Sequence, residues 1–325
     1  MNGILSFVLA VLVYPGAFVA LLAAWALTWG RESVRAAVSR EVVPSPLREV
    51  NEIRSDLARD IVQPEGLYPW LTITASYAAL LMPLLALILL PIPGNPLVQA
   101  IGLQGDVIAC AALLLGVPAL RLLVAWATPS PYTRLAADRG VRLLAGVVLT
   151  MALAITAGAE QGAVLTLTPT PTKAAQPFWW VVTHILAALA FVFVLPPLTR
   201  AVASLREGRQ SQYQDLDLVS GELTELNGRD LACFRIAEAL QFVAVAAYFA
   251  TVFILPLFPS AFGRGHDLLW LAGLVVTALG IGAWEGFAAN RPPSGDRPPL
   301  NWWLGLPVLI ALFSLVTAAI AMRGS

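Results

Sequence analysis

Eight long apolar runs constrain this chain more than any other feature of its sequence. Each is long enough to cross a hydrocarbon core of about 30 Å as an α-helix, which takes about 20 residues. They cover residues 3–28, 69–92, 106–128, 141–167, 177–199, 231–258, 267–289 and 302–321. Because the bilayer interior accepts only helices and closed barrels, we predict an all-α polytopic membrane protein with eight transmembrane helices, forming one membrane domain over residues 1–325.

The composition agrees with this class of protein. Hydrophobic residues make up 58% of the chain and charged residues only 12%, whereas a soluble domain has about 25% charged residues. The formal net charge is zero, so the chain lacks the excess of Lys and Arg that a nucleic-acid partner requires. Cys110 and Cys233 lie apart inside apolar runs without metal-ligand spacing, and we therefore expect no metal site.

Basic residues are distributed unevenly among the connecting segments. The segments after the first, third, fifth and seventh runs hold fifteen of the 20 basic residues, whereas the opposite side holds Lys173, Arg264 and Arg323. Since cytoplasmic segments carry the excess of Lys and Arg, we expect an inner (cytoplasmic) membrane location with both termini on the non-cytoplasmic side. The first run lacks a basic flank and a cleavage site, so we expect it to remain as a helix.

The polar segment after the first run has a helical pattern of its own. Its apolar residues recur at steps of three and four, with charged residues between them: Leu47, Val50, Ile53, Leu57 and Ile61. This pattern predicts an amphipathic helix over residues 46–61 that lies along the cytoplasmic membrane surface. An ordinary solvated linker helix is the alternative.

Ionisable side chains inside the apolar runs are candidate functional residues. A charged side chain at a helix centre costs about 2.5–3.5 kcal/mol in hydrocarbon, so it normally faces a partner or a wet cavity. Arg235 and Glu238 stand three residues apart, a helical spacing that predicts a pair; a static ion pair and a switchable one are both open. Arg121 either pairs with Glu238 or Glu285, lines a water-filled path, or reaches the membrane surface. His184 is either a proton carrier or a hydrogen-bonded structural histidine.

The acidic loop 200–230 leads into the run 231–258 with the most specific motif of the chain. It reads Asp217-Leu-Val-Ser-Gly-Glu-Leu-Thr-Glu225-Leu-Asn-Gly and continues through Arg-Asp-Leu-Ala to Ala-Glu238. This stretch resembles the loop between the fifth and sixth helices in the family shared by respiratory complex I subunit 1 and the membrane anchor subunit of formate hydrogenlyase and related membrane-bound hydrogenases. Segments 46–60 and 125–139 resemble that family's surface helix and third loop.

The resemblance implies a non-catalytic membrane subunit of an energy-converting redox complex. Such a subunit docks a hydrophilic electron-transfer arm and links it to proton or sodium translocation. The implied partners are an Fe–S small subunit and a hydrogenase-like large subunit of the arm, antiporter-like membrane subunits, and the lipid bilayer. No cofactor is expected on this chain alone, with Fe–S clusters on the partners and a quinone at the interface with the arm. The alternatives are a non-conducting anchor for a soluble oxidoreductase and, more weakly, a secondary transporter, since the two halves show no inverted repeat.

The resemblance also implies residue roles. For ion translocation these are a cytoplasmic mouth and intramembrane groups: Asp217, Glu222, Glu225, Arg235, Glu238, Glu285 and Arg121. For docking of the arm they are charged residues of the cytoplasmic segments: Arg48, Arg54, Arg59, Arg134, Arg139, Arg229 and Asp230. The chain departs from the family pattern at Gly140 and Val148, where relatives carry glutamates, and in the first loop, 31–40, which in the family helps to shape a quinone entrance.

Overall fold

The computed structural model describes residues 17–59, 68–90, 92, 106–159, 178–199, 226–257, 265–289 and 300–323. Within these ranges the regular elements are all helical, which confirms the predicted all-α fold. They are α2 (Ala17–Ser39), α3 (Arg48–Leu57), α4 (Pro69–Leu89), α6 (Val107–Ala127), α7 (Pro131–Ala159), α8 (Phe178–Thr199), α11 (Gly228–Phe249), α12 (Gly265–Ala289) and α13 (Leu300–Arg323), with a π-helical turn η1 (Ala250–Ile254) and a 3₁₀ turn η2 (Leu255–Leu257) after α11.

Six segments of the described chain are long and apolar enough to cross a membrane. They are Pro69–Leu89, Val107–Ala127, Thr133–Ala157, Phe178–Leu195, Gly228–Leu257 and Asp267–Phe287. These coincide with six of the eight predicted spans. The eighth predicted span is represented by a shorter apolar segment, Gly305–Ile320. Residues 3–16 of the first predicted span lie outside the described ranges, and its remainder forms the first half of α2. The count of eight therefore stays a prediction.

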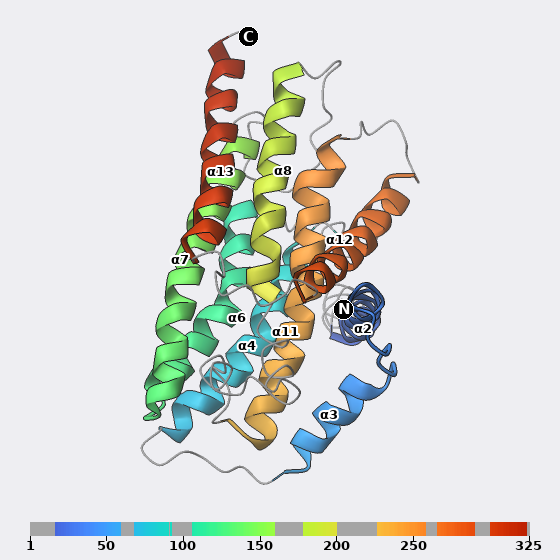
Figure 1. The fold of residues 1–325 in the computed structure, drawn as a ribbon, viewed down its shortest axis with the longest axis vertical. Coiled ribbons are helices and arrows are strands. Elements are labelled where there is room, and N and C mark those ends of the chain that lie inside the picture. The colour runs from blue at the N-terminus through green and yellow to red at the C-terminus, as the bar shows by residue number, and fades with distance from the viewer. Residues whose placement is uncertain are drawn as a thin grey trace, which may run out of the picture.

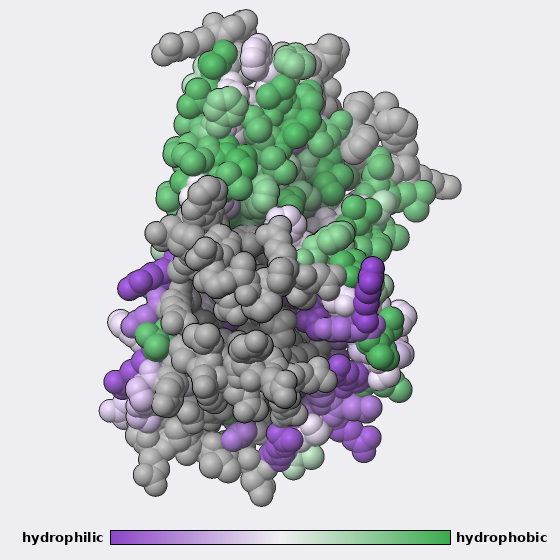
Figure 2. Space-filling view, viewed as in Figure 1, coloured by the Kyte–Doolittle hydropathy of each residue, from purple (hydrophilic) through white to green (hydrophobic). Residues whose placement is uncertain are grey.

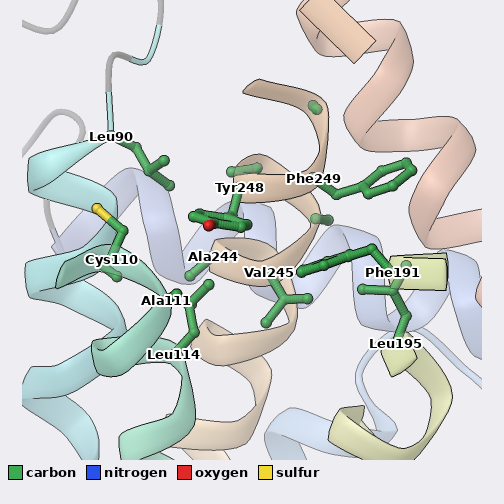
Figure 3. Packing of buried hydrophobic residues seen from close by; sticks show 14 of the residues in the cluster. Leu90, Cys110, Ala111, Leu114, Phe191, Leu195, Ala244, Val245, Tyr248 and Phe249 are labelled. Carbon is green, nitrogen blue, oxygen red and sulfur yellow. The ribbon is translucent and has the colours of Figure 1, made fainter. Parts of the chain in front are cut away.

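The central helix of the bundle is α11 (Figure 1), and most of its residues are buried. It contacts α2, α3, α4, α6, α8 and α12. Small side chains explain how so many neighbours fit: lipid does not drive helices together as water does, and small residues let backbones approach closely. Figure 3 shows Ala244 of α11 beside Ala111 of α6, while on the other side the ring centroids of Phe249 and Phe191 are 5.8 Å apart.

The end of α11 is set by a proline. Pro256 has no N–H, and its ring clashes with the carbonyl four residues earlier, so a regular α-helix cannot continue through it. The helix first widens into the π turn η1 and then ends in η2. Backbone carbonyls near this irregular turn are available to side chains of other helices, as the His184 contact below illustrates.

Polar and apolar surfaces separate along the long axis of the molecule. In Figure 2 apolar side chains cover the upper part of the visible face and hydrophilic ones gather lower down, at the level of α3 in Figure 1. α3 lies within the predicted surface helix. Leu47, Val50 and Leu57 are exposed, whereas Asp56 is buried. The apolar side of α3 therefore faces away from the other helices, and its carboxylates face toward them.

Candidate functional site

Buried arginine–carboxylate contacts surround the first half of α11, and the first joins α6 to α11. Arg121 Nη1 donates to Glu238 Oε1 at 2.9 Å, and the side chains are only 11% and 6% exposed. One of the two pairings that the sequence predicted for Arg121 is therefore confirmed. Because charges removed from water lose their hydration, losing one member of a buried pair typically costs about 3–5 kcal/mol.

A second pair joins α2 to α12. Arg31 contacts Glu285 with two hydrogen bonds, from Nε to Oε2 at 2.8 Å and from Nη2 to Oε1 at 2.5 Å. This bidentate geometry matches the planar guanidinium to the planar carboxylate. The guanidinium carbon also lies 5.0 Å from the ring centroid of Phe242, so the pair contacts α11 as well. Both charged residues are buried, each with 8% exposure.

The third contact corrects the predicted Arg235–Glu238 pair. Arg235 Nη1 lies 3.0 Å from Asp56 Oδ2 and 3.3 Å from Glu52 Oε2, both on α3, while Glu238 binds Arg121. Residues three apart on a helix differ by about 60° around its axis, which is enough to direct them to different neighbours. The prediction was wrong because α3 supplies two carboxylates on the side that Arg235 faces.

Glu49 of α3 connects these contacts, and the sequence interpretation missed it. Its Oε2 accepts a hydrogen bond of 2.8 Å from the Thr28 hydroxyl of α2. Burial raises the pKa of the Glu49 carboxyl above its usual value, opposed by the Thr28 hydrogen bond and by the charges of Arg31 and Arg235. Glu49 thus lies within electrostatic reach of both arginines.

The other predicted docking residues are mostly at the surface. Arg48 pairs with Glu52 at 3.0 Å, Arg59 lies 3.4 Å from Asp56, and Arg54 is exposed. In the remaining segments Arg134 donates to the Thr128 carbonyl at 3.0 Å, and the Arg229 guanidinium lies 5.9 Å from the centroid of Tyr77. For Arg139 the structure describes the backbone alone, within α7.

Asp230, predicted to dock the arm, lies inside the protein. It is 3% exposed, and its Oδ1 accepts a hydrogen bond of 3.2 Å from the Ser76 hydroxyl of α4. As an acidic residue in the first turn of α11 it also interacts favourably with the helix dipole. Its carboxylate therefore connects two helices of this chain. The predicted mouth acids, Asp217, Glu222 and Glu225, lie outside the described residues.

A proline explains the polar contact of Gln241. Pro118 lies inside α6 and has no N–H, so the carbonyl four residues earlier, Leu114, lacks its usual helical partner. The Gln241 Nε2 of α11 donates to that carbonyl at 2.9 Å. Gln241 thus compensates for the proline and ties α11 to α6 one turn beyond the Arg121–Glu238 pair.

His184 of α8 makes the contact expected of a structural histidine. Its Nε2 lies 3.0 Å from the Phe253 carbonyl in η1, and because a carbonyl only accepts, Nε2 donates. Trp180 stacks on the imidazole with centroids 4.9 Å apart. Between this site and the ion pairs, α11 packs through the apolar layer of Figure 3, which includes Ala244 and Val245.

The departure at Val148 has a clear structural setting. Val148 is 41% exposed on α7, where it lines an open groove with other apolar residues of the same helix. The groove is lined by Val141, Leu144, Ala145, Val148, Leu149 and Ala152. A position that carries a glutamate in relatives is here part of an apolar helix surface.

The described residues thus form a charged layer at one level of a mostly apolar bundle. Five helices contribute to it: α2, α3, α6, α11 and α12. Chemically, such a layer can exchange protons or rearrange its pairs, because the ionised and neutral forms of a buried carboxylate respond strongly to the distance of an arginine.

Comparisons with known proteins agree with this architecture. A sequence model of the NADH dehydrogenase family matches residues 9–323. Two relatives from strains of Cereibacter sphaeroides, each the second H-type subunit of an NADH-quinone oxidoreductase, are 33% identical over 141 residues, which is 42% of this chain and 40% of each relative. The match thus spans about two fifths of the length of these relatives.

A solved structure resembles the whole chain. It is a chain of the membrane-bound sulfane sulfur reductase, an archaeal respiratory membrane complex, with a TM-score of 0.73 and 17% identity. The superposition covers 98% of this chain and 100% of that one, and it supports the fold. Since the family match extends over nearly all residues, the chain belongs to the NADH dehydrogenase family, whose members resemble complex I subunit 1.

Proposed function

We propose that this chain is the membrane subunit of a complex I-like or membrane-bound hydrogenase-like respiratory assembly, and that it links an attached electron-transfer arm to proton or sodium translocation. One observation carries the proposal: α11 lies among buried arginine–carboxylate contacts from four other helices. Ionisable groups at membrane depth are costly, and they normally mark an ion pathway, a proton relay or a counter-ion.

The proposed topology has eight spans, both termini outside and α3 along the cytoplasmic surface. Two features support it. The end of α13 and α3 lie at opposite ends of the molecule (Figure 1), and α3 turns Leu47, Val50 and Leu57 outward, as a helix in a membrane interface does. The acidic loop 200–230 then lies on the same side as α3 and forms the mouth through Asp217, Glu222 and Glu225.

The proposed partners follow from the relatives and from the placement of charges. An Fe–S small subunit and a hydrogenase-like large subunit would cover α3 and the acidic loop, with Arg48, Arg54, Arg59, Arg134, Arg139 and Arg229 at the contact. Antiporter-like subunits would adjoin within the membrane. Asp230 leaves this set because its carboxylate binds Ser76.

Two electron carriers belong to the same proposal. Fe–S clusters would lie on the arm. A quinone headgroup needs polar donors that are not already engaged, whereas Arg31, Arg121 and Arg235 all bind carboxylates. The described residues thus give no sign of a prepared quinone site around α11, and we place any quinone at the interface with the arm.

In this proposal Glu238 and Glu285 are the intramembrane relays. A buried carboxylate that moves away from its arginine takes up a proton more readily, because burial disfavours the charged form. Redox chemistry on the arm would move α3 or the acidic loop, and Arg235 and Glu49 would carry that movement to α11 and α2. Arg121 and Arg31 would then control the two relays.

The test is ion transport by the purified complex in sealed vesicles. Glu238→Gln and Glu285→Gln are each expected to assemble and to transfer electrons while losing most ion movement. Glu41→Gln is the matched control, because Glu41 is exposed and only 3.6 Å from the partly exposed Arg35. Full ion transport in both relay variants would refute the proposal.

A non-conducting anchor is the second candidate. The observation that favours it is Val148, which places an apolar side chain at a position where relatives carry a glutamate. An anchor predicts normal assembly and electron transfer with no ion movement in the unsubstituted complex.

A further inference from the structure

Two glycines of α12 lie directly against the backbone of α2. A Cβ at Gly282 would lie 2.3 Å from the carbonyl oxygen of Arg31 and 3.0 Å from its Cα. One turn later, a Cβ at Gly286 would lie 2.7 Å from the Cβ of Val38 and 2.8 Å from the carbonyl oxygen of Arg35. Separations below 3.0 Å are essentially never seen for a real Cβ, so a residue with a side chain fits at neither position without a shift.

Backbone conformation does not explain these glycines. Among the described residues the glycine with a positive φ is Gly228, so neither position in α12 requires a left-handed conformation. Inside a helix, glycine is less favourable than alanine by about 1 kcal/mol. The close approach to α2 is therefore the physical reason for glycine here.

The ion pair lies at this crossing. Glu285 stands between the two glycines in sequence, and its carboxylate binds Arg31, the residue whose backbone contacts Gly282. A methyl group at Gly282 forces the two helices apart by at least about 0.7 Å, from 2.3 Å to 3.0 Å. Because both hydrogen bonds of the pair join the same two helices, that displacement also lengthens or rotates them.

We propose that Gly282 and Gly286 are positioning residues that hold Arg31 in bidentate contact with Glu285. They set the separation of α2 and α12, and the pair depends on that separation. The consequence for ion movement rests on the proposed function, since Glu285 matters for transport only if the chain couples redox chemistry to ion translocation. Misplacement of a functional group by about 1 Å can cost about 10²-fold in rate.

A matched control lies on the same helix. Gly280 has nothing within 4 Å of a built Cβ, so Gly280→Ala gains the same helix propensity as Gly282→Ala without touching α2. A difference between these two variants therefore reports the α2 contact. Gly286→Ala provides a second test should Gly282→Ala fail to assemble.

The experiment uses the purified complex in two measurements. Static infrared spectra with Glu285→Gln as reference identify the Glu285 carboxylate band, which is expected to shift in Gly282→Ala and Gly286→Ala and to stay unchanged in Gly280→Ala. Ion transport per electron is expected to fall about tenfold or more in Gly282→Ala, within the range that misplacement produces. In the Glu285→Gln background the same substitution is expected to cause no further loss.

Two results would overturn the inference. One is an unshifted carboxylate band in both assembled glycine variants. The other is an equal loss of transport from Gly282→Ala with and without the Glu285 carboxylate, since independent effects add and shared ones do not. If Glu285→Gln transports ions normally, the role of Glu285 in the proposed function fails, and the infrared band still decides whether the glycines position the pair.

Discussion

The Arg121–Glu238 pair offers a quantitative test of the charged layer. Arg121→Met keeps an unbranched apolar side chain on α6 and removes the charge that lies 2.9 Å from Glu238. Glu238→Gln keeps the shape of the side chain and removes the negative charge. The double variant removes both charges, and comparing the three isolates the interaction between them.

The distance sets the expected size of the effect. With an effective dielectric constant of about 20, two unit charges 2.9 Å apart attract by roughly 6 kcal/mol. Desolvation of both groups offsets part of this attraction, and breaking a buried pair typically costs about 3–5 kcal/mol. We therefore expect each single variant to lose about 3 kcal/mol of unfolding free energy. The double variant is expected to lose less than the sum by about 2–4 kcal/mol.

The assay is reversible unfolding of the purified chain in mixed detergent micelles. Arg142→Met serves as control, because Arg142 is exposed on α7, and it is expected to stay within about 0.5 kcal/mol of the unsubstituted protein. Additivity of the two single variants within about 0.5 kcal/mol would refute the reasoning, since it would mean that the pair contributes no coupling.

Three further predictions concern contacts around α11. Burial raises the pKa of Glu49, so the docked state favours its neutral form. Stability from this group is then complete below the unfolded pKa, about 4.3, and is lost as pH rises through the folded pKa. Glu49→Gln should slow amide exchange of α3 at neutral pH and remove that pH dependence; an unchanged profile contradicts this. Arg235→Met should weaken protection of α3 by about 1.5–3 kcal/mol, because charged hydrogen bonds are lost, whereas Arg48→Met at an exposed pair should change it by less than about 1 kcal/mol; equal effects would count against the buried contact. Gln241→Leu should cost about 1–3 kcal/mol in unfolding free energy by leaving a carbonyl of α6 unpaired, and Pro118→Ala should restore most of it by supplying an N–H. No restoration would separate the glutamine from the proline.

Helix positions were predictable because the bilayer imposes a local rule. A run of about 20 apolar residues satisfies both the length of the hydrocarbon core and the internal hydrogen bonding of the backbone. The six segments that are apolar and long enough in the structure coincide with predicted runs. The helix over Arg48–Leu57 was likewise visible in the three- and four-residue spacing of its apolar residues.

The partners of the buried charges were harder to predict. Sequence spacing paired Arg235 with Glu238, but pairing across helices depends on which neighbour each side chain faces. The structure directs Arg235 to α3 and gives Glu238 to Arg121. Arg121 itself was recognised because its charge stands inside an apolar run.

Arg31 and Glu49 were missed for a different reason. Both lie in a polar segment next to the first apolar run, where a charge carries no evident cost and gives no signal. Their burial arises only when α2 crosses α12 and α3 packs on α2 and α11. The one available signal for Arg31 was that Glu285 needs a cation, and the glycines at 282 and 286 mark the helix face where a second helix approaches.

The central claim is that Glu238 takes part in ion movement and does not serve only as a static contact. The most direct measurement is an infrared difference spectrum of the assembled complex during turnover, with Glu238→Gln as reference. The account predicts a carboxyl band that changes with turnover and is absent from the variant. A spectrum that is identical in the two proteins, with ion transport intact in the variant, would contradict it.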